Sequence, residues 1–432
     1  MDASFLLLLV FAALLLIGTP IAVALGIGGV AGILAGHDIV MLGTVGTNTY
    51  NAIAKYPLIA IPLFILTGMM FERSGVAQRL VEFAQACIGP RKGGLALVAV
   101  LVCLIMGGMS GSGPADAAAV ATVMLPSMMK AGYPKPFTAS VIAASASTAI
   151  LIPPSIALII YSVLVPGTDL RALFAAGLVP GLLLGVAIAV PTVWLSGRHG
   201  FGEAGAIERP AFWRSLWRAL PGLLAPVIIL GGLRSGLFTP TETAVVAVFY
   251  GLLVGTMLYR TMGVHEVYDV LVESAKISAV LMLIISLAGL FAWAGSTLGT
   301  FRTGAEALLG ISTNQWVVLG IIMVLLLLAG MVLDGISIYL ITLPLLVPVA
   351  QAFGWSYVWF GVVMAINIAM GQFTPPVAVN LMVTAKIADI PLEDTFRWVG
   401  WLLLSMAVAL ALVIAFPEIA LWLPRVLGYR IT

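Results

Sequence analysis

Charged side chains are scarce in this sequence. Lys, Arg, Asp and Glu make up 9% of its 432 residues, whereas a soluble domain carries about 25%. So few charges cannot cover a surface that faces water, and most of the surface must therefore face the lipid bilayer. The sequence also has no basic run that could bind a nucleic acid. The 46 glycines and 24 prolines are typical of transmembrane helices, so the composition predicts an integral membrane protein.

Side chains with reactive or metal-binding groups are equally few. The two cysteines, Cys87 and Cys103, do not form a metal-ligand pattern, and we interpret both as apolar packing residues. The three histidines, His37, His199 and His265, fall far apart in loops or at helix ends. No HExxH, GxSxG or phosphate-binding loop occurs. Because an enzyme needs a nucleophile with its base or a metal centre, the sequence predicts that this chain is not an enzyme.

Apolar runs divide the chain into two series of six. Several runs approach the ~20 residues that a membrane span needs, and the shorter ones are flanked by Gly, Pro or amphipathic stretches. The first run has no basic segment before it and continues into further apolar sequence, so we expect no cleavable signal peptide. The first series is Ser4–Gly18, Pro20–Gly36, Pro57–Phe71, Gly93–Met129, Pro136–Val165 and Leu170–Leu195. The second is Leu220–Gly232, Ala244–Tyr259, Ile277–Trp293, Trp316–Ala350, Val358–Ala385 and Trp398–Phe416.

The two series match at a nearly constant offset. Adding 222 to a first-half number maps Pro153-Pro154 onto Pro375-Pro376 and Gly108-Met109 onto Gly330-Met331. The same shift maps Pro126, Gly132, Leu170 and Phe174 onto Pro348, Gly354, Leu392 and Phe396. An offset of 220 maps Thr19-Pro20 onto Thr239-Pro240. So many matches in one register predict an internal duplication.

Each half has five ordinary spans and one run that is too long for a single crossing. The long runs hold about 37 and 35 residues, and a helix of that length would reach roughly 55 Å, against about 30 Å of hydrocarbon. Small polar residues interrupt them at Ser110–Gly113 and Asp334–Gly335, so we expect re-entrant helical hairpins. Because five spans is an odd number, the second half must lie upside down, as in the inverted repeats of secondary transporters.

The predicted fold is therefore an all-α integral membrane protein with an inverted repeat of five spans and one hairpin in each half. Residues 1–196 form the first repeat with a hairpin at 92–131, residues 197–219 a cytoplasmic linker, and residues 220–432 the second repeat with a hairpin at 314–350. With the N-terminus outside, 14 Lys and Arg residues lie inside and 6 outside, which obeys the positive-inside rule.

The four breaks in the helices are the predicted functional site. Broken helices occur at membrane depth only where protein or a water-filled cavity supports them. Proline lacks an amide hydrogen and pushes the preceding residue out of the helix, so each double proline frees carbonyl oxygens. Sodium suits oxygen ligands, and unwound carbonyls coordinate it in transporters of this architecture. We therefore predict two sodium sites, each pairing one hairpin tip with one double-proline break.

The first predicted site joins the tip at Ser110–Gly113 to the break at Ser145–Pro153, and the second joins Asp334–Ser337 to Gly371–Pro375. An anion between the two tips would meet hydroxyls and free amides at helix N-termini. The candidate sodium residues are Ser110, Gly111, Ser112, Ser147, Pro153, Asp334, Gly335, Ser337, Gly371, Thr374 and Pro375. The candidate substrate residues are Ser112, Gly113, Ser155, Gln372 and Asn380.

Structural alternatives exist for many of these residues. Hydroxyls in membrane helices often bond their own backbone. Asp116 and Asp334 are the only acidic residues deep in the long apolar runs and so are functional candidates, but Asp116 could instead cap the second helix of its hairpin. Gln372 and Asn380 could orient substrate or brace the broken helix, and bracing is favoured for Asn367. We interpret Glu242 as a helix-start residue.

Several segments together resemble a known family. They are GMSGSGPADAAAVATVMLPSM, IPPSI, FTPTETAVVAV, LDGISIYLITLPLLVPV and FTPPVAVNLMV. These segments, spread over nearly the whole chain, are similar to the large permease subunit (DctM-like) of tripartite ATP-independent periplasmic (TRAP) transporters. The resemblance implies an elevator mechanism, in which the hairpins and broken helices carry sodium and substrate past a scaffold. It also implies sodium ligands at Ser110, Ser112, Pro153, Asp334, Gly335, Thr374 and Pro375.

The resemblance further implies partners and a location. A small four-helix membrane subunit (DctQ-like), expected as a separate chain, and a periplasmic substrate-binding protein (DctP-like) would serve a permease in the bacterial inner membrane. Family substrates include C4-dicarboxylates, sialic acid and other organic acids, and nothing in the sequence chooses among them. Two alternatives stay open: a stand-alone ion-coupled carrier of organic anions and, less favoured because of the two opposed hairpins, a channel.

Overall fold

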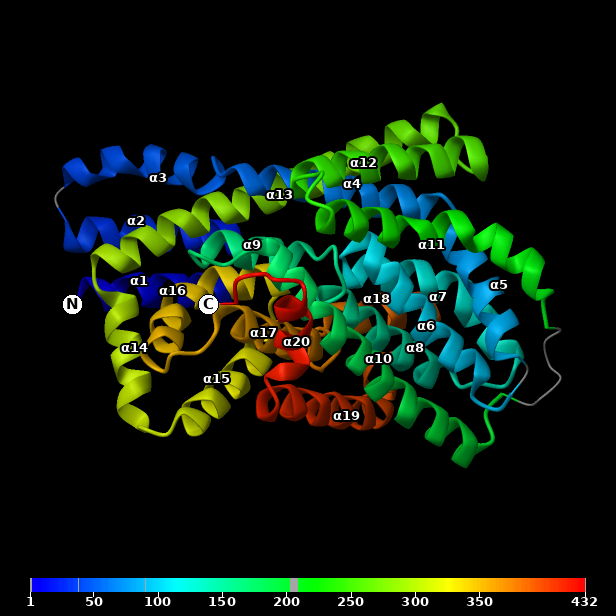
Figure 1. Cartoon of the computed structure of the whole chain (residues 1–432). Helices are drawn as coiled ribbons and strands as arrows, with labels where there is room; N and C mark the ends of the chain where they lie inside the picture. The colour runs from blue at the N-terminus through cyan, green and yellow to red at the C-terminus, as the bar shows by residue number, and fades with distance from the viewer. Residues whose placement is uncertain (1, 38, 90, 203–208, 432) are drawn as a thin grey trace.

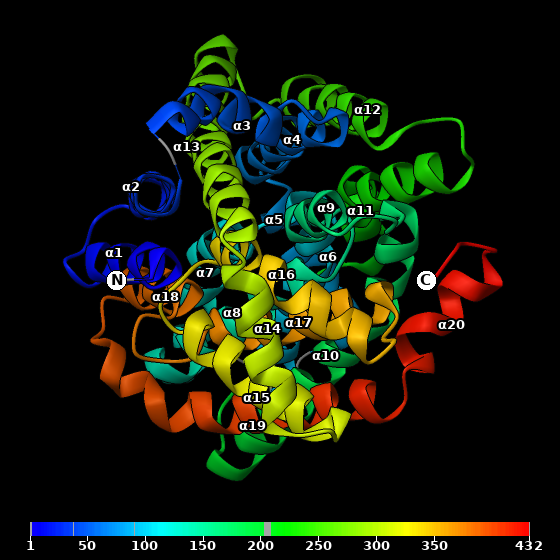
Figure 2. The same ribbon diagram turned by 90° about the vertical axis from the view of Figure 1, so that its left-hand side faces the viewer.

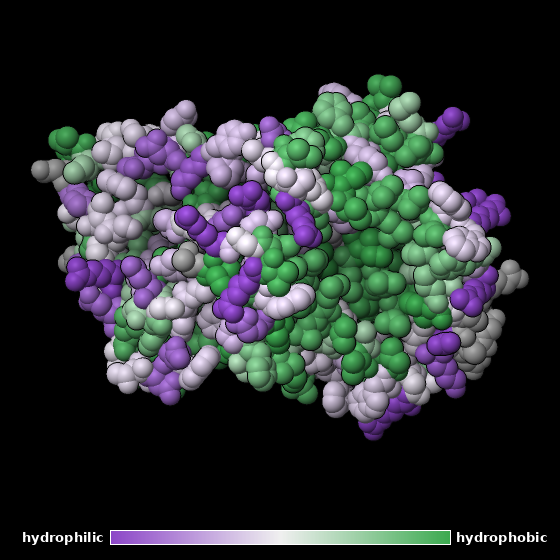
Figure 3. Space-filling model, viewed as in Figure 1, coloured by the Kyte–Doolittle hydropathy of each residue, from purple (hydrophilic) through white to green (hydrophobic). Residues whose placement is uncertain are grey.

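The computed structural model describes residues 2–37, 39–89, 91–202 and 209–431, and every regular element in these ranges is a helix (Figure 1). Within these described residues, seven helices are long and apolar enough to cross a membrane. Large apolar side chains such as Val190, Val227 and Leu404 are exposed on the surface. Figure 3 shows hydrophobic side chains over the middle and right of one face, with hydrophilic ones along the right-hand edge. The chain is an all-α, multi-pass membrane protein, as the sequence predicts.

The helices of the first half run in the following order. They are α1 (Ala3–Leu16), α2 (Ile21–Gly36), η1 (Ile39–Gly43), α3 (Thr44–Ile53), η2 (Tyr56–Ile59), α4 (Ala60–Arg73), α5 (Val76–Ile88), α6 (Gly94–Ser110), α7 (Gly113–Lys130), α8 (Lys135–Ala146), η3 (Ser147–Ile150), α9 (Ile156–Leu164) and α10 (Leu170–His199).

The second half continues with the remaining helices. They are α11 (Phe212–Arg234), α12 (Pro240–Leu253), η4 (Val254–Leu258), α13 (Val264–Thr297), α14 (Thr300–Ile311), α15 (Gln315–Gly330), α16 (Gly335–Ala352), α17 (Tyr357–Gly371), α18 (Val379–Ala388), η5 (Leu392–Thr395), α19 (Phe396–Ala415) and α20 (Glu418–Val426).

Helix bounds recur along the chain at the offset seen in the sequence. Helix α7 begins at Gly113 and α16 at Gly335, which is 222 residues later, and the two helices have the same length. Helices α5 and α14, which precede the two long runs, lie at opposite ends of the molecule in Figure 1. The same view places α6 and α7 in one half and α15 and α16 in the other. Two oppositely oriented repeats would give this arrangement, and the assignment of the repeats stays a prediction.

Most of the helices fall into two groups. Helices α1 to α4 pack mainly on one another and on α12 and α13, while α6 to α10 pack mainly on one another and on α17 to α19. We call the first group, with α11, the scaffold, and we call α6 to α10 with α15 to α19 the core. In the end-on view of Figure 2 most scaffold helices lie above the core. The core contains both long runs and both double prolines, so all four breaks belong to one group.

Each long run is interrupted at its predicted centre. Helix α6 ends at Ser110 and α7 starts at Gly113, and between them Gly111 has a φ of +59° that favours glycine. Helix α15 ends at Gly330, and α16 starts after the capping residue Asp334. The bounds of the two helix pairs, 94–130 and 315–352, lie within two residues of the predicted hairpins.

The two double prolines interrupt helices in the same way. The chain is non-helical from Leu151 to Ser155, between η3 and α9, and from Gln372 to Ala378, between α17 and α18. The Pro153–Pro154 and Pro375–Pro376 peptides are both cis. Neither segment can continue a helix, because proline lacks the amide hydrogen that the ladder requires.

Amphipathic helices are missing from the sequence prediction. Helix α5 buries Val76, Leu80 and Ala84 at helical spacing while its other face is polar, so no continuous apolar run marks it. Helix α13 begins at Val264, well before the predicted start at Ile277. Apolar runs mark where a helix enters lipid, whereas the helix itself continues into water.

The predicted linker 197–219 is shorter in the structure. Helix α10 continues to His199 and α11 begins at Phe212, so only the middle of this segment connects the helices. Residues 203–208 lie outside the described residues. The polar side chains that suggest a linker belong partly to the ends of α10 and α11.

Candidate functional site

The first hairpin tip touches the first break. A Cβ atom added to Gly111 would lie 2.4 Å from the carbonyl oxygen of Pro154 and 3.3 Å from the amide nitrogen of Ile156. One turn earlier, a Cβ on Gly107 would lie 2.9 Å from Cα of Ala149. Only glycines allow this approach, so the small residues of α6 bring the tip against the unwound segment. The contact extends to Ile156, slightly beyond the Ser145–Pro153 segment that the sequence predicted.

The second tip is hydrogen-bonded to the second break. The amide nitrogens of Val377 and Ala378 donate to the carbonyl oxygen of Met331 over 3.2 and 3.3 Å. Behind the tip, a Cβ on Gly371 would lie 2.6 Å from Cα of Gly330. The structure therefore places each hairpin tip beside a double-proline break. The second contact includes Gly371 of the predicted segment, but its partners Gly330 and Met331 precede the predicted tip residues Asp334–Ser337.

The two pairs also meet each other. A Cβ on Gly113 would lie 2.8 Å from Oε1 of Gln372 and 2.9 Å from Nδ2 of Asn380. Nδ2 of Asn380 also lies 3.4 Å from both Oε1 of Gln372 and the carbonyl oxygen of Ala143. Asn380 thus joins α18, the unwound segment before it and α8. Its place supports the bracing interpretation for this side chain, while Gln372 also faces a cavity.

A cavity of about 590 Å³ opens at this junction. Both tips, Gln372, and the scaffold helices α4 and α13 line it. Seven of the predicted site residues line the cavity: Ser110, Gly111, Ser112, Gly113, Asp334, Gly335 and Gln372. The scaffold side is made by residues that sequence reasoning missed: Ile65, Gly68, Met69, Glu72, Glu273, Ile277, Val280, Leu281 and Ile284. Most of these residues are apolar and carry no sequence signal; they are identified only because the fold places them in the cavity wall.

The other predicted residues lie behind the cavity wall. They are Ser147, Pro153, Ser155, Ser337, Gly371, Thr374, Pro375 and Asn380, and none of them lines the cavity. The hydroxyls of Ser147 and Thr374 donate to the carbonyl oxygens of Ala144 and Met370, over 2.7 and 2.5 Å. Both hydroxyls bond nearby backbone carbonyls of the same segment, which is the structural alternative stated above.

Ser155 caps a helix. Its hydroxyl accepts from the amide nitrogen of Leu158 over 3.2 Å and donates to the carbonyl oxygen of Ile150 over 2.5 Å. The side chain is fully buried and starts α9 directly after the double proline. Its hydroxyl therefore fixes the geometry of the break rather than facing the cavity.

Each tip carries one carboxylate. Asp116 is fully buried; its Oδ1 accepts from the Ser110 hydroxyl over 2.7 Å, while its Oδ2 has no partner among the described residues. Asp334 caps α16: its Oδ2 accepts from the amide nitrogens of Ile336 and Ser337 over 3.0 and 3.2 Å, and its Oδ1 accepts from the Ser337 hydroxyl. Asp116 is not the cap of α7, because Ser112 occupies that position and Asp116 turns back towards Ser110.

Two further interpretations from the sequence are confirmed. Glu242 and Thr239 form a reciprocal capping box at the start of α12, so Glu242 is a helix-start residue. Nδ2 of Asn367 donates to the carbonyl oxygen of Met323 over 2.9 Å, and Asn367 thereby braces α17 against the first helix of the second hairpin.

The donor set around the cavity restricts which cation could bind. The described residues contain no group of three or more His, Cys, Asp or Glu side chains that could hold a metal ion. A cation at either tip would therefore be held by hydroxyls, backbone carbonyls and a single carboxylate. Such an oxygen set suits a hard cation of low charge rather than a transition metal.

One end of the cavity carries charge. Glu72 and Glu273 both belong to its lining, and Arg73 pairs with Glu273 over 3.3 Å. These three groups lie near the end of α4 and in the first third of α13. The sequence offered one signal for them, because each is a charged residue next to an apolar run.

Sequence comparison assigns the family. The profile of the family described as "Tripartite ATP-independent periplasmic transporter, DctM component" matches residues 8–419. The chain belongs to this family. It is therefore a TRAP transporter permease subunit and not an enzyme, as the sequence predicts.

Named relatives agree with this assignment. The chain is 38% identical over 373 residues to the C4-dicarboxylate TRAP transporter large permease protein DctM of Pseudomonas aeruginosa, covering 86% of this chain and 87% of that protein. It is 35% identical over 413 residues to the isethionate TRAP transporter permease protein DctMQ of Oleidesulfovibrio alaskensis. That match covers 95% of this chain but 65% of the relative, so the chain spans about two thirds of that protein's length.

A solved structure shows the same fold. The YdaH transporter of Alcanivorax borkumensis superimposes with a TM-score of 0.66, over 97% of this chain and 100% of that chain. The two sequences are 15% identical, so this likeness concerns the fold alone.

Proposed function

We propose that this chain is the permease subunit of a sodium-coupled importer of small organic anions, carboxylates or sulfonates. The observation that supports this function best is the cavity of about 590 Å³, in which both hairpin tips face two scaffold helices. Two relatives are named for isethionate and for C4-dicarboxylates, and both kinds of solute are small and anionic.

The proposed sodium sites lie at the tips. At the first tip, Ser112 lines the cavity and its hydroxyl makes no hydrogen bond to the amides of α7, so this oxygen would be available to a cation. Asp116 beneath it supplies a carboxylate with one unpartnered oxygen. At the second tip, Asp334 lines the cavity and supplies the carboxylate directly. Unwound carbonyls near Pro153 and Pro375 would complete each site.

The anion would bind at the start of α7. Four amide groups at the beginning of any helix lack partners inside the helix, and they attract negative charge. The cap residue Ser112 makes no side-chain hydrogen bond to the amides of α7, whereas Asp334 occupies those of α16. Gly113 at the start of α7 lines the cavity beside Gln372, whose amide group is a further hydrogen-bond donor.

The elevator mechanism follows from the two groups of helices. In this proposal the core carries both tips and both breaks, and the scaffold contributes α4 and α13 to the cavity wall. A core that slides along α4 and α13 would expose the same cavity on the other side of the membrane. In the assumed orientation, with the N-terminus in the periplasm, Glu72 and Glu273 mark the cytoplasmic mouth.

We also propose the partners and the location. The chain would lie in the bacterial inner membrane with a small four-helix subunit, and a periplasmic binding protein would deliver the anion. A labelling experiment tests the orientation: Cys87 is exposed and Cys103 is buried, so a membrane-impermeant thiol reagent should label Cys87 from the cytoplasmic side only. Labelling from the periplasmic side would reverse the assignment.

Reconstitution tests the function itself. Proteoliposomes with the chain, the small subunit and a loaded binding protein should accumulate the anion when a sodium gradient points inwards, and not when potassium replaces sodium. Accumulation that does not depend on sodium would overturn the coupling. Uptake by the chain alone, unaffected by a binding protein, would favour the stand-alone carrier, and ionic conductance without accumulation would favour the channel.

A further inference from the structure

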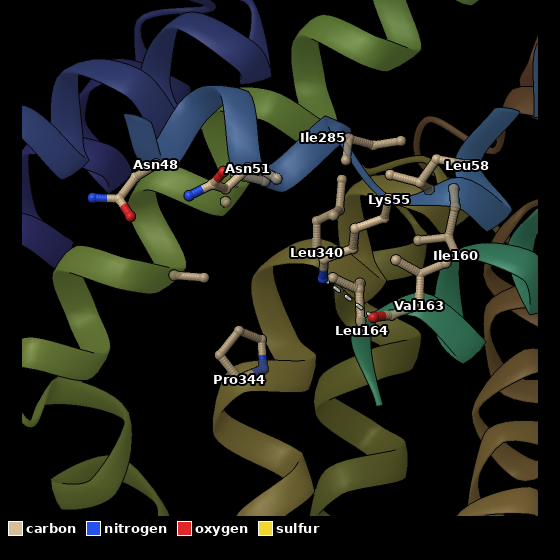
Figure 4. A pocket seen from close by; sticks show the side chains of 14 residues that line it. Asn48, Asn51, Lys55, Leu58, Ile160, Val163, Leu164, Ile285, Leu340 and Pro344 are labelled. Atoms are coloured by element: carbon tan, nitrogen blue, oxygen red, sulfur yellow. Dashed lines mark hydrogen bonds between the residues drawn. The ribbon is translucent and has the colours of Figure 1, made fainter. Parts of the chain in front are cut away.

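A second cavity, of about 250 Å³, lies between the scaffold and the core. Helix α3, the turn η2 and α13 form its scaffold side, and α9 and α16 form its core side. Figure 4 shows these helices around the opening, with Pro344 of α16 at one side. The first cavity uses α13 from Glu273 to Ile284, and the second uses the same helix from Ile285 to Ala292. The two cavities therefore follow one another along α13, towards opposite ends of the helix.

The polar side chains of the second cavity are Lys55, Asn48 and Asn51, and its lining has no acidic residue. Asn48 and Asn51 are three residues apart on α3 and so lie on one face of that helix. The remaining lining is apolar, including Ile160, Leu340 and Pro344. A cavity with one ammonium group and two amides in an apolar wall is complementary to an anion with a small carbon skeleton.

Lys55 reaches across the boundary between scaffold and core. Its Nζ donates to the carbonyl oxygen of Val163 over 3.4 Å, near the C-terminal end of α9, as Figure 4 shows. An ammonium group has three donors, so this single long hydrogen bond leaves donor capacity for a ligand. The side chain is exposed to the cavity and not buried by its neighbours.

The offset of 222 relates three lining residues of the second cavity to lining residues of the first. It maps Asn51, Lys55 and Leu58 of the second cavity onto Glu273, Ile277 and Val280, and all three of these line the first cavity. Equivalent positions thus carry an amide and a cation in one cavity, and a carboxylate and an isoleucine in the other. The second cavity thus has a cation and no acidic residue in its lining, whereas the first has Glu72 and Glu273, the latter paired with Arg73.

We propose that the second cavity is a docking site for a small organic anion, with Lys55 as its positive charge and the amides of Asn48 and Asn51 as donors. The direction of transport rests on the function proposed above: the anion would bind here on the periplasmic side before it reaches the hairpin tips. The docking site itself requires only that the cavity binds a carboxylate or sulfonate.

Thiol protection tests this site without any transport measurement. Val163→Cys in a Cys87→Ser background places a reactive group in the lining and keeps Lys55 and both asparagines. The protein is reconstituted in vesicles of phosphatidylcholine, so no anionic lipid competes. The probes are succinate, isethionate and N-acetylneuraminate, with potassium chloride at equal ionic strength as the blank. At about ten times its Kd, a bound probe should slow labelling about tenfold.

The matched variants decide the role of Lys55. Lys55→Met should shift protection to higher probe concentration, about tenfold or more, whereas Lys55→Arg should retain most of it. Arg234→Met is the control, because Arg234 is also exposed, lies on the same predicted side and does not line the cavity. An unchanged labelling rate without probe shows that each variant keeps the shape of the cavity.

Two results would overturn the proposal. No protection by any of the three probes would mean that the cavity is not an anion site. Equal protection of the Val163→Cys, Cys87→Ser protein with and without Lys55→Met would mean that Lys55 only caps the end of α9. The uptake assay fails or succeeds separately: uptake without protection removes the docking site alone, and protection without sodium-dependent uptake removes the proposed function alone.

Discussion

The two hairpin tips occupy equivalent positions but differ in chemistry. Ser112 and Asp334 are 222 residues apart, and each precedes the second helix of its hairpin. Asp334 uses its carboxylate to cap α16, whereas the Ser112 hydroxyl leaves the amides of α7 uncapped. The first tip has its carboxylate one turn later, at Asp116, where it is fully buried under the Ser110 hydroxyl.

This difference shows how a duplicated segment can serve two ligands. A cap that carries negative charge satisfies the helix start and repels an anion, so the second tip suits a cation alone. An uncapped helix start attracts an anion, and the carboxylate of the first tip is withdrawn from the cavity surface. We therefore expect the second tip to affect sodium affinity alone, and the first tip to affect both sodium and the anion.

The largest expected effect comes from Gly111→Ala. The new Cβ would overlap the Pro154 carbonyl oxygen at 2.4 Å, and the alanine would have to adopt a φ of +59°. Together these two effects cost about 2–5 kcal/mol. The first tip would then separate from its break, and uptake should fall roughly tenfold or more. Uptake and thermal stability in detergent measure the two consequences.

Gly132→Ala is the matched control for that prediction. Gly132 has a φ of +83° with no atom within 4 Å of an added Cβ. This change should therefore cost only the strain of placing alanine in the left-handed backbone region, about 1–2 kcal/mol. If both variants transport equally well, the contact between the first tip and its break has no role in transport.

Asp334 is the next most sensitive position. Asn is as good a helix cap as Asp, so Asp334→Asn should keep α16 folded and remove only the charge. The sodium concentration for half-maximal uptake should rise about tenfold, equivalent to about 1.4 kcal/mol, while the dependence on the anion stays the same. Asp334→Ala should add a loss of stability of about 1 kcal/mol. An unchanged sodium dependence in Asp334→Asn would remove this residue from the proposed sodium site.

A smaller effect is expected for Ser112→Ala. Its hydroxyl makes no hydrogen bond in the described part of the chain, so its loss should leave the expression level unchanged. Removing one neutral oxygen ligand should weaken sodium-dependent uptake severalfold, and the concentration of anion for half-maximal uptake should rise as well. A change in sodium dependence alone would show that the two tips do not differ in the way described above.

The smallest effect on transport is expected for Ser155→Ala. Its hydroxyl caps α9 behind the cavity wall, so the change should lower stability by about 1 kcal/mol. Sodium and anion dependence should both remain close to wild type. A selective loss of substrate affinity would restore Ser155 to the substrate-binding role that the sequence predicted.

Features that depend on local backbone chemistry could be read from the sequence. The double prolines and the glycines at the tips have fixed consequences for a helix, so the breaks and the hairpin bounds were predicted closely. The candidates that line the cavity, such as Ser110, Ser112 and Gln372, came from the same reasoning. Asp334 was found because a carboxylate within an apolar run needs an explanation.

Features that depend on tertiary contacts could not be read in this way. A hydroxyl that lines a cavity and one that bonds the nearby backbone look alike in a sequence, so sequence reasoning does not separate Ser147 and Thr374 from Ser112. The cavity wall from α4 and α13 consists mostly of apolar residues such as Ile65 and Val280, which only the packing of scaffold on core identifies.

Equilibrium binding of radioactive sodium to the purified chain tests the central claim most directly. The account predicts that Ser112→Ala and Asp334→Asn each weaken the binding of a different sodium ion, that the double variant loses both, and that Ser155→Ala binds as wild type does. If the double variant binds sodium with the affinity and stoichiometry of wild type, the tips are not the sodium sites and the account is contradicted.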